Sequence, residues 1–273
     1  HGTEGEELAH RLGNWSAFAF AEQARGFRDI GGTPANDTLE RRGRHALELA
    51  GDMGFPWLAS VGHARLGLAA FWRGNWVDAL AEFERAADLE GGGAVGGQSG
   101  RLLLIHAYLG HQDTALDLID RARSQFPIVG RPASARSWNL AATAVEAFRL
   151  LGDTEGVAAL YPTMSALADI SGSVMRAWDF RLVATLQAMA AGCQGEWDAA
   201  EAHFADALRQ SKALPMLREE PEAQRFFAQM LIDRDRPGDR ARAEMLLETA
   251  CESYTAFGMP QHAALTRELA STI

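Results

Sequence analysis

The chain has 273 residues, of which 47% are hydrophobic, and it carries a formal net charge of −10. This apolar content supports a sizeable core and excludes an intrinsically disordered chain. The acidic balance, with Lys212 as the sole lysine, excludes the concentrated basic patch that a nucleic-acid partner requires. No run of about eighteen apolar residues is present, so we also expect no membrane partner.

The two cysteines, Cys193 and Cys251, form no CxxC motif, which excludes a zinc knuckle and a redox motif. Reduced thiols and the absence of a signal peptide are typical of a cytoplasmic protein. No two histidines stand at the HExxH spacing of a zinc site, so we expect no metal and no cofactor. The sequence begins at His1 instead of Met, and we interpret it as a fragment of a longer polypeptide or a chain with a residual tag.

Residues 1–55 contain two amphipathic stretches. We predict one helix over Leu8–Arg28 and another over Thr38–Met53. The run Gly31-Gly32-Thr33-Pro34 predicts the turn between them. We interpret this part as a degenerate N-terminal repeat.

From residue 56 on, an internal repeat dominates the sequence. Each unit has a glycine that follows one amphipathic pattern and precedes another, which predicts a left-handed glycine turn between two helices. The spacings are 36, 42, 43 and 43 residues, and the glycines are Gly74, Gly110, Gly152, Gly195 and Gly238. We predict five helical hairpins, at 56–90, 99–126, 134–171, 173–213 and 219–257, and a capping helix within 258–273.

The helix after each glycine carries a small, a large and a small residue at the fifth, ninth and twelfth positions. This spacing places the three side chains on one helix face, where the small ones let a neighbouring helix approach closely. The hairpins at 56–90, 173–213 and 219–257 have Ala79, Phe83 and Ala86, then Ala200, Phe204 and Ala207, then Ala243, Leu247 and Ala250. No stretch alternates long enough to predict a convincing strand.

This pattern resembles the second helix of tetratricopeptide repeats. In the hairpin at 56–90 the resemblance extends to the first helix, through Leu66, Gly67 and Ala70. The other hairpins depart from the family, with Leu103, Val145, Ala188 and Leu231 where it has glycine. The resemblance implies an all-α fold, a right-handed solenoid of tetratricopeptide-like antiparallel helical hairpins that forms a single domain over residues 1–273.

A second resemblance covers residues 135–270. Its clearest parts are the runs 196–208 and 228–240, followed by Phe257-Gly258-Met259-Pro260. They resemble the C-terminal helical region of large bacterial signalling ATPases, in which a nucleotide cyclase or another effector domain precedes an NTPase module and a tetratricopeptide tail. The resemblance implies a sensor or assembly role in signal transduction and not a reaction carried by this segment.

Motifs that carry chemistry are missing from the sequence. The glycine cluster at 91–97 lacks the preceding strand and the Gly-Lys-Ser/Thr of a phosphate loop, so we predict a loop between hairpins. No G-x-S-x-G nucleophile motif is present. We interpret Glu219 and Glu220 as acids at a helix start, where they complement the helix dipole. We therefore predict that the chain is not an enzyme and has no catalytic residues.

The candidate binding residues are tryptophans, arginines and their polar neighbours on predicted first helices. First helices of stacked hairpins line a concave groove, in which Trp offers contact area and Arg a bidentate donor. Two sets recur forty residues apart and a third precedes them: Arg136, Trp138 and Asn139, then Arg176, Trp178 and Asp179, with Arg65 and Trp72 earlier in the chain. The alternative is that the rings pack between hairpins and the arginines face solvent.

These patterns leave two functions open. The leading hypothesis is a non-catalytic protein-interaction and regulatory scaffold, whose partner is a protein or peptide, another domain of the parent polypeptide or a second copy of the chain. The alternative is a small-molecule sensor, with its ligand in the concave groove shifting a conformational equilibrium. A large apolar patch would favour the scaffold.

Overall fold

The computed structural model describes residues 36–90, 98–171, 181–214 and 216–273, and the single positions 4, 8, 11 and 17. Within them the fold is all-α, as predicted, and contains no β-strand. The first half comprises α3 (Asn36–Met53), α4 (Pro56–Trp72), α5 (Trp76–Leu89), α6 (Ser99–Tyr108), α7 (Gln112–Ala122) and α8 (Ala135–Leu150). The second half comprises α9 (Thr154–Ala159), α10 (Tyr161–Ser171), α11 (Val183–Cys193), α12 (Trp197–Ala213), α13 (Glu219–Arg234), α14 (Asp239–Ala256) and α15 (Pro260–Ala270).

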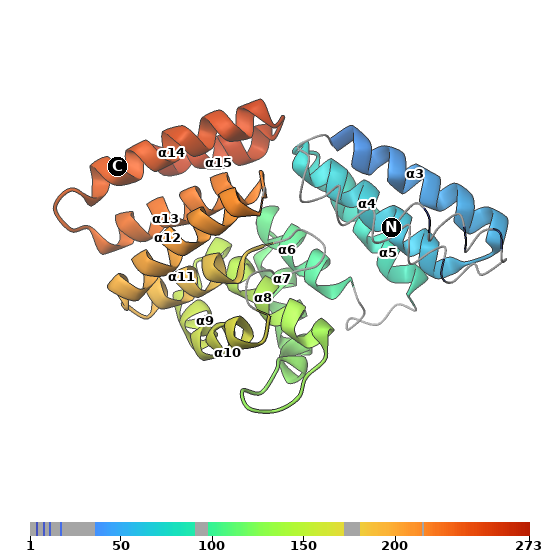
Figure 1. Cartoon of the computed structure of the whole chain (residues 1–273), viewed down its shortest axis with the longest axis horizontal. Helices are drawn as coiled ribbons and strands as arrows, with labels where there is room; N and C mark the ends of the chain where they lie inside the picture. The colour runs from blue at the N-terminus through green and yellow to red at the C-terminus, as the bar shows by residue number, and fades with distance from the viewer. Residues whose placement is uncertain are drawn as a thin grey trace.

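Successive helices pack side by side as pairs, and the pairs stack in chain order (Figure 1). The five repeat glycines lie in the turns within the pairs α4/α5, α6/α7, α8/α9, α11/α12 and α13/α14. All five have a positive φ, between 71° and 89°. Only glycine adopts this left-handed conformation without strain, so the predicted turn type is confirmed. Three predicted features lie outside the described residues, apart from the single positions 8, 11 and 17: the helix over Leu8–Arg28, the turn Gly31-Gly32-Thr33-Pro34 and the loop at 91–97.

The pair that begins with α8 differs from the prediction, because its second helix is split into α9 and α10. Pro162 stands in the first turn of α10 and has no N–H to donate to the carbonyl of Ala158, four residues earlier. That carbonyl accepts a hydrogen bond from Nε2 of Gln194 instead, at 2.8 Å. A side chain from α11's end thus satisfies the backbone group that the proline leaves free.

The small and large residues of the repeat lie in the core, as predicted. Ala79, Ala200 and Ala243 are completely buried, and Phe83 and Phe204 are at most 1% exposed. The ring of Phe204 stacks on Phe227 of α13, with centroids 5.0 Å apart. Close packing against Phe83 also explains Gly67, the glycine that resembles the tetratricopeptide pattern. A β-carbon at this position would stand 2.6 Å from the Phe83 ring.

One core cluster joins helices that are far apart in the sequence. It combines α4 and α6 with the last two helices, so that the upper ends of α14 and α15 lie beside α4 (Figure 1). The main contributors are Leu68, Phe71, Trp72, Ile105, Tyr108, Tyr254, Met259 and Ala263. Apolar burial therefore holds the beginning of the helix stack to its end.

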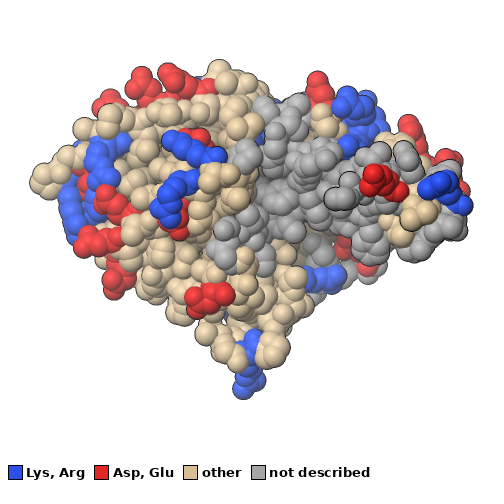
Figure 2. Space-filling view, viewed as in Figure 1, with Lys and Arg blue, Asp and Glu red and all other residues tan. Residues whose placement is uncertain are grey.

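Basic and acidic side chains are interspersed over the described surface (Figure 2), and no large basic field faces the viewer. Among the described helices, none is both long enough and apolar enough to cross a membrane.

Replacement of Phe204 by alanine should lower the free energy of unfolding by about 3–5 kcal/mol, because it leaves a cavity beside Phe227. Chemical denaturation measures this loss. The matched control is Met245→Ala, on a side chain that is 61% exposed, which should change the stability by less than about 0.5 kcal/mol. A loss below about 1 kcal/mol for Phe204→Ala would contradict the burial of the Phe204 ring against Phe227.

Candidate functional site

The described members of the predicted binding set differ in their exposure to solvent. Arg65 and Trp72 are both buried on α4. On α8, Trp138 is buried in the core and Arg136 is exposed. Asn139 is half-buried, and its Nδ2 donates to the carbonyl of Ala135 at 2.9 Å. Arg176, Trp178 and Asp179 lie outside the described residues.

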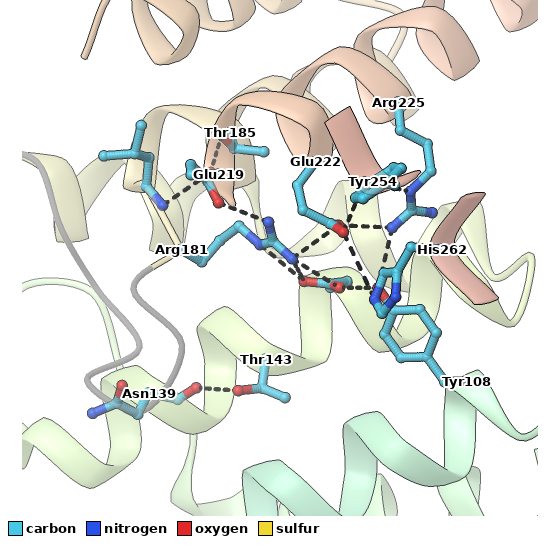
Figure 3. Close-up of polar contacts among 12 residues, drawn as sticks. Tyr108, Asn139, Thr143, Arg181, Thr185, Glu219, Glu222, Arg225, Tyr254 and His262 are labelled. Atoms are coloured by element: carbon cyan, nitrogen blue, oxygen red, sulfur yellow. Dashed lines mark hydrogen bonds and ion pairs between the residues drawn. The ribbon is translucent and has the colours of Figure 1, made fainter. Parts of the chain in front are cut away.

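A different set of polar residues meets in the interior (Figure 3), and we refer to it as the buried ion cluster. Its members come from six helices and from the residue pair before α11. Each charged member is at most 6% exposed. The cluster comprises Tyr108, Glu146, Arg181, Thr185, Glu219, Glu222, Arg225, Tyr254 and His262.

Arg181 lies at the centre of the cluster. Its Nε donates to Oε2 of Glu146 at 3.1 Å, and its Nη2 donates to Oε2 at 2.9 Å and to Oε1 at 3.1 Å. Its Nη1 donates to Glu219 at 2.7 Å, and its Nη2 also reaches Glu222 at 3.1 Å. One guanidinium therefore links α8 to α13 through the start of α11, with the fork geometry that only arginine offers.

A second guanidinium, that of Arg225, extends the cluster towards the last helices. Its Nη2 donates to Glu222 at 2.8 Å and to the hydroxyl of Tyr108 at 3.1 Å. The Tyr108 hydroxyl donates to Glu146 at 2.8 Å, and that of Tyr254 donates to Glu222 at 2.8 Å. The two tyrosines thus connect α6 and α14 to the same charges.

The glutamates of α13 have opposite pKa shifts. Burial raises the pKa of Glu219 to about 7, although Arg181 and the hydrogen bonds from Thr185 and the Leu182 N–H oppose this shift. Burial acts in the same direction on Glu222, but the Arg225 and Arg181 guanidiniums outweigh it and hold its pKa well below the usual range. Glu222 therefore stays ionised, whereas Glu219 titrates near neutral pH.

His262 on α15 closes the cluster on its apolar side. It is fully buried, and its nearest acidic oxygen is Oε1 of Glu222, at 3.9 Å. Burial lowers its pKa to about 4, so the imidazole is neutral at pH 7. Five aromatic rings surround it at centroid distances of 5.1 to 5.9 Å: Phe71, Trp72, Trp76, Tyr108 and Tyr254.

Four nitrogens in this aromatic shell have no hydrogen-bond partner. They are Nδ1 and Nε2 of His262 and the indole Nε1 of Trp72 and of Trp76, and all are buried. Buried polar atoms without a partner are rare in native proteins and call for a specific explanation, such as a bound water or ligand. This shell therefore has unused hydrogen-bonding capacity beside the cluster.

No carboxylate oxygen of the cluster is left without a hydrogen bond. All six carboxylate oxygens of Glu146, Glu219 and Glu222 accept at least one hydrogen bond from the cluster or from the Leu182 N–H. A carboxylate that acts as a general base must instead reach a substrate proton. The arrangement is that of a mutually satisfied ion network. Among the described residues, no group of three or more His, Cys, Asp or Glu side chains could hold a metal ion.

A second feature lies on the surface, between α14 and α15, and we call it the terminal groove. It has a cavity volume of about 780 Å³. Apolar side chains of Met245, Leu247, Cys251, Ala256 and Ala270 contribute to its lining. Met245 is 61% exposed, so its side chain is open to solvent at the groove.

Comparison with known proteins gives no identification. No protein-family model matches the chain, and no curated protein matches it significantly.

Variants of Glu219 and His262 should show opposite pH dependences of stability. The pKa of Glu219 is higher in the folded than in the unfolded chain, so ionisation above about pH 4.5 costs stability until about pH 7. Relative to the parent chain, Glu219→Gln should therefore gain about 3 kcal/mol between pH 4.5 and pH 8. Urea denaturation at each pH measures the difference.

For His262 the folded pKa lies below the unfolded value, so its contribution is complete above about pH 6.5 and is lost towards pH 4. Relative to the parent chain, His262→Phe should accordingly gain stability as the pH falls. Two variants with the same slope, or with none, would contradict the environments assigned to these side chains.

Proposed function

We propose that the chain is a non-catalytic protein-interaction scaffold, built as a right-handed solenoid of tetratricopeptide-like helical hairpins. The observation that carries the proposal is the terminal groove, an open apolar hollow on the outside of the last helix pair. Stacked hairpins commonly bind partners through the helix surfaces that their neighbours leave uncovered.

The buried ion cluster supports the same proposal from the inside. Its carboxylates and guanidiniums satisfy one another, so the charged groups of the interior serve to fix the stack. A rigid stack with fixed helix spacing offers a partner a preorganised surface, which reduces the entropic cost of binding.

Within this proposal we place the chain in a larger signalling ATPase or nucleotide cyclase, as a regulatory or assembly region. The support is the resemblance of residues 135–270 alone. The free thiols of Cys193 and Cys251 agree with a cytoplasmic setting. The partner is then a separate protein or peptide, or another domain of the parent polypeptide.

A second candidate function, a small-molecule sensor, is favoured by the aromatic shell around His262. The indole N–H groups of Trp72 and Trp76 can only donate, so a ligand there must supply acceptor oxygens. The imidazole of His262 offers either an acceptor or a donor to the same molecule. A small carboxylate or carbonyl compound has this chemistry.

Site-specific photo-crosslinking in cells that make the native polypeptide tests the scaffold. A photoreactive amino acid replaces one exposed apolar residue at a time: Val77 on α5, Ile170 on α10 or Met245 on α14. The scaffold predicts a discrete protein adduct from at least one of the three positions, because a partner must cover part of the outer surface.

The sensor predicts a different outcome. No position should give a protein adduct, whereas a small carboxylate should change the fluorescence of the purified chain through Trp72 and Trp76. That combination would overturn the scaffold and leave the sensor.

A further inference from the structure

The terminal groove carries a row of acids along one side. Glu244, Glu248 and Glu252 follow one another at intervals of four residues on α14, so their side chains lie on one helix face. All three are exposed, and within the described part of the chain none of them forms an ion pair or a side-chain hydrogen bond. In Figure 2 acidic side chains stand along the upper edge of the view, over α14 and α15. Like charges at this spacing destabilise a helix, so the row has a cost that the isolated chain does not recover.

An acid at the position equivalent to Glu244 forms ion pairs in the preceding repeat. Glu201 stands six residues after Gly195, and Glu244 stands six residues after Gly238, so the two are equivalent positions of α12 and α14. Glu201 accepts hydrogen bonds from Arg242 at 2.6 Å and from Arg234 at 2.8 Å. Both arginines belong to the next helix pair in the stack. An acid at this position therefore meets arginines from the helices that cover it.

The terminal groove has the length of a single packed helix. α14 packs on α13, and its Arg242 reaches Glu201 of α12. The surface of α14 and α15 at the terminal groove is open by comparison. The groove runs along α14 from Glu244 to Ala256, which is a length of about 18 Å or three helical turns. On the α15 side its rim carries a single base, Arg267, whose Nη1 lies 3.4 Å from Cys251 Sγ.

We propose that the terminal groove binds an arginine-bearing amphipathic helix of a partner polypeptide. The apolar stripe of that helix lies against the exposed Met245 and Ala256, and its arginines pair with Glu244, Glu248 and Glu252. The mode is that of a helix in a groove, in which apolar anchors give affinity and charged flanks give orientation. This inference rests on the proposed scaffold function and names the chemistry of its partner.

The probe is a synthetic, fluorescein-labelled helical peptide of about four turns, ~16 residues, with leucine at every third or fourth position and arginine on both flanks. A second peptide has glutamate in place of every arginine. Fluorescence anisotropy should show saturable binding of the basic peptide to the chain and none of the acidic peptide up to about 0.1 mM. The affinity should fall as salt is added, because exposed charges are screened.

Charge reversal then locates the site. The variant Glu244→Lys/Glu248→Lys/Glu252→Lys should bind the basic peptide roughly tenfold more weakly, as expected for the loss of three exposed ion pairs. Met245→Ser should weaken binding without any change in charge.

The matched control Glu84→Lys/Asp88→Lys/Asp169→Lys alters three exposed acids on α5 and α10, with the same change in net charge, and should bind like the parent. Far-UV circular dichroism and thermal melting confirm that each variant is folded.

The inference is overturned if the basic peptide does not bind, or if the α14 variant and the control lose affinity equally, which would mean non-specific attraction to an acidic protein. It is also overturned if sedimentation shows that the parent chain self-associates and the α14 variant does not, since the occupant is then a second copy. Photo-crosslinks from α5 or α10 alone would refute this groove and leave the scaffold intact, whereas no adduct from any position would refute the scaffold itself.

Discussion

The bridge that Arg181 forms to three buried glutamates is the constraint on which the rest of the structure depends. The guanidinium is 3% exposed and contacts Glu146, Glu219 and Glu222, which come from α8 and α13. Removing such charges from water costs several kcal/mol per ion, and the cost is recovered only when every partner is in place. The helices can therefore stack in very few ways that keep the network complete, which gives the stack a single register.

The other features of the fold follow from this requirement. Completely buried alanines such as Ala200 and Ala243 let helix pairs approach closely enough for side chains from six helices to meet. The aromatic shell around His262 excludes water from one side of the network, which strengthens its electrostatic interactions. The charged groups of the interior are occupied with one another. The proposed partner would therefore meet the outer surface, where the terminal groove combines apolar side chains with acids.

The local features of this fold were predictable from the sequence, and the buried ion cluster was not. Glycine turns and the small-large-small pattern depend on residues close together in the chain, so Gly74 to Gly238 and the alanines of α5, α12 and α14 were placed correctly. Pro162 was a local signal for the split between α9 and α10, but the predicted hairpin at 134–171 had one continuous second helix. The cluster joins positions far apart in the sequence, such as Tyr108 and Arg225, which are 117 residues apart, and only packing brings them together. Glu146, a lone acid within the apolar run of α8, was the available hint. Trp72 and Trp138 are buried, as expected from the alternative that the tryptophan rings pack between hairpins.

A double-mutant cycle between Arg181 and Glu146 tests the central claim most directly. Free energies of unfolding are measured by urea denaturation for Arg181→Met, for Glu146→Gln and for the double variant. Each single variant leaves an uncompensated buried group and should lose about 3–5 kcal/mol. The double variant should lose clearly less than the sum of the two, with a coupling energy of about 2 kcal/mol or more. Losses that add to within about 0.5 kcal/mol would show that the two side chains act independently, and that the network does not set the register of the stack.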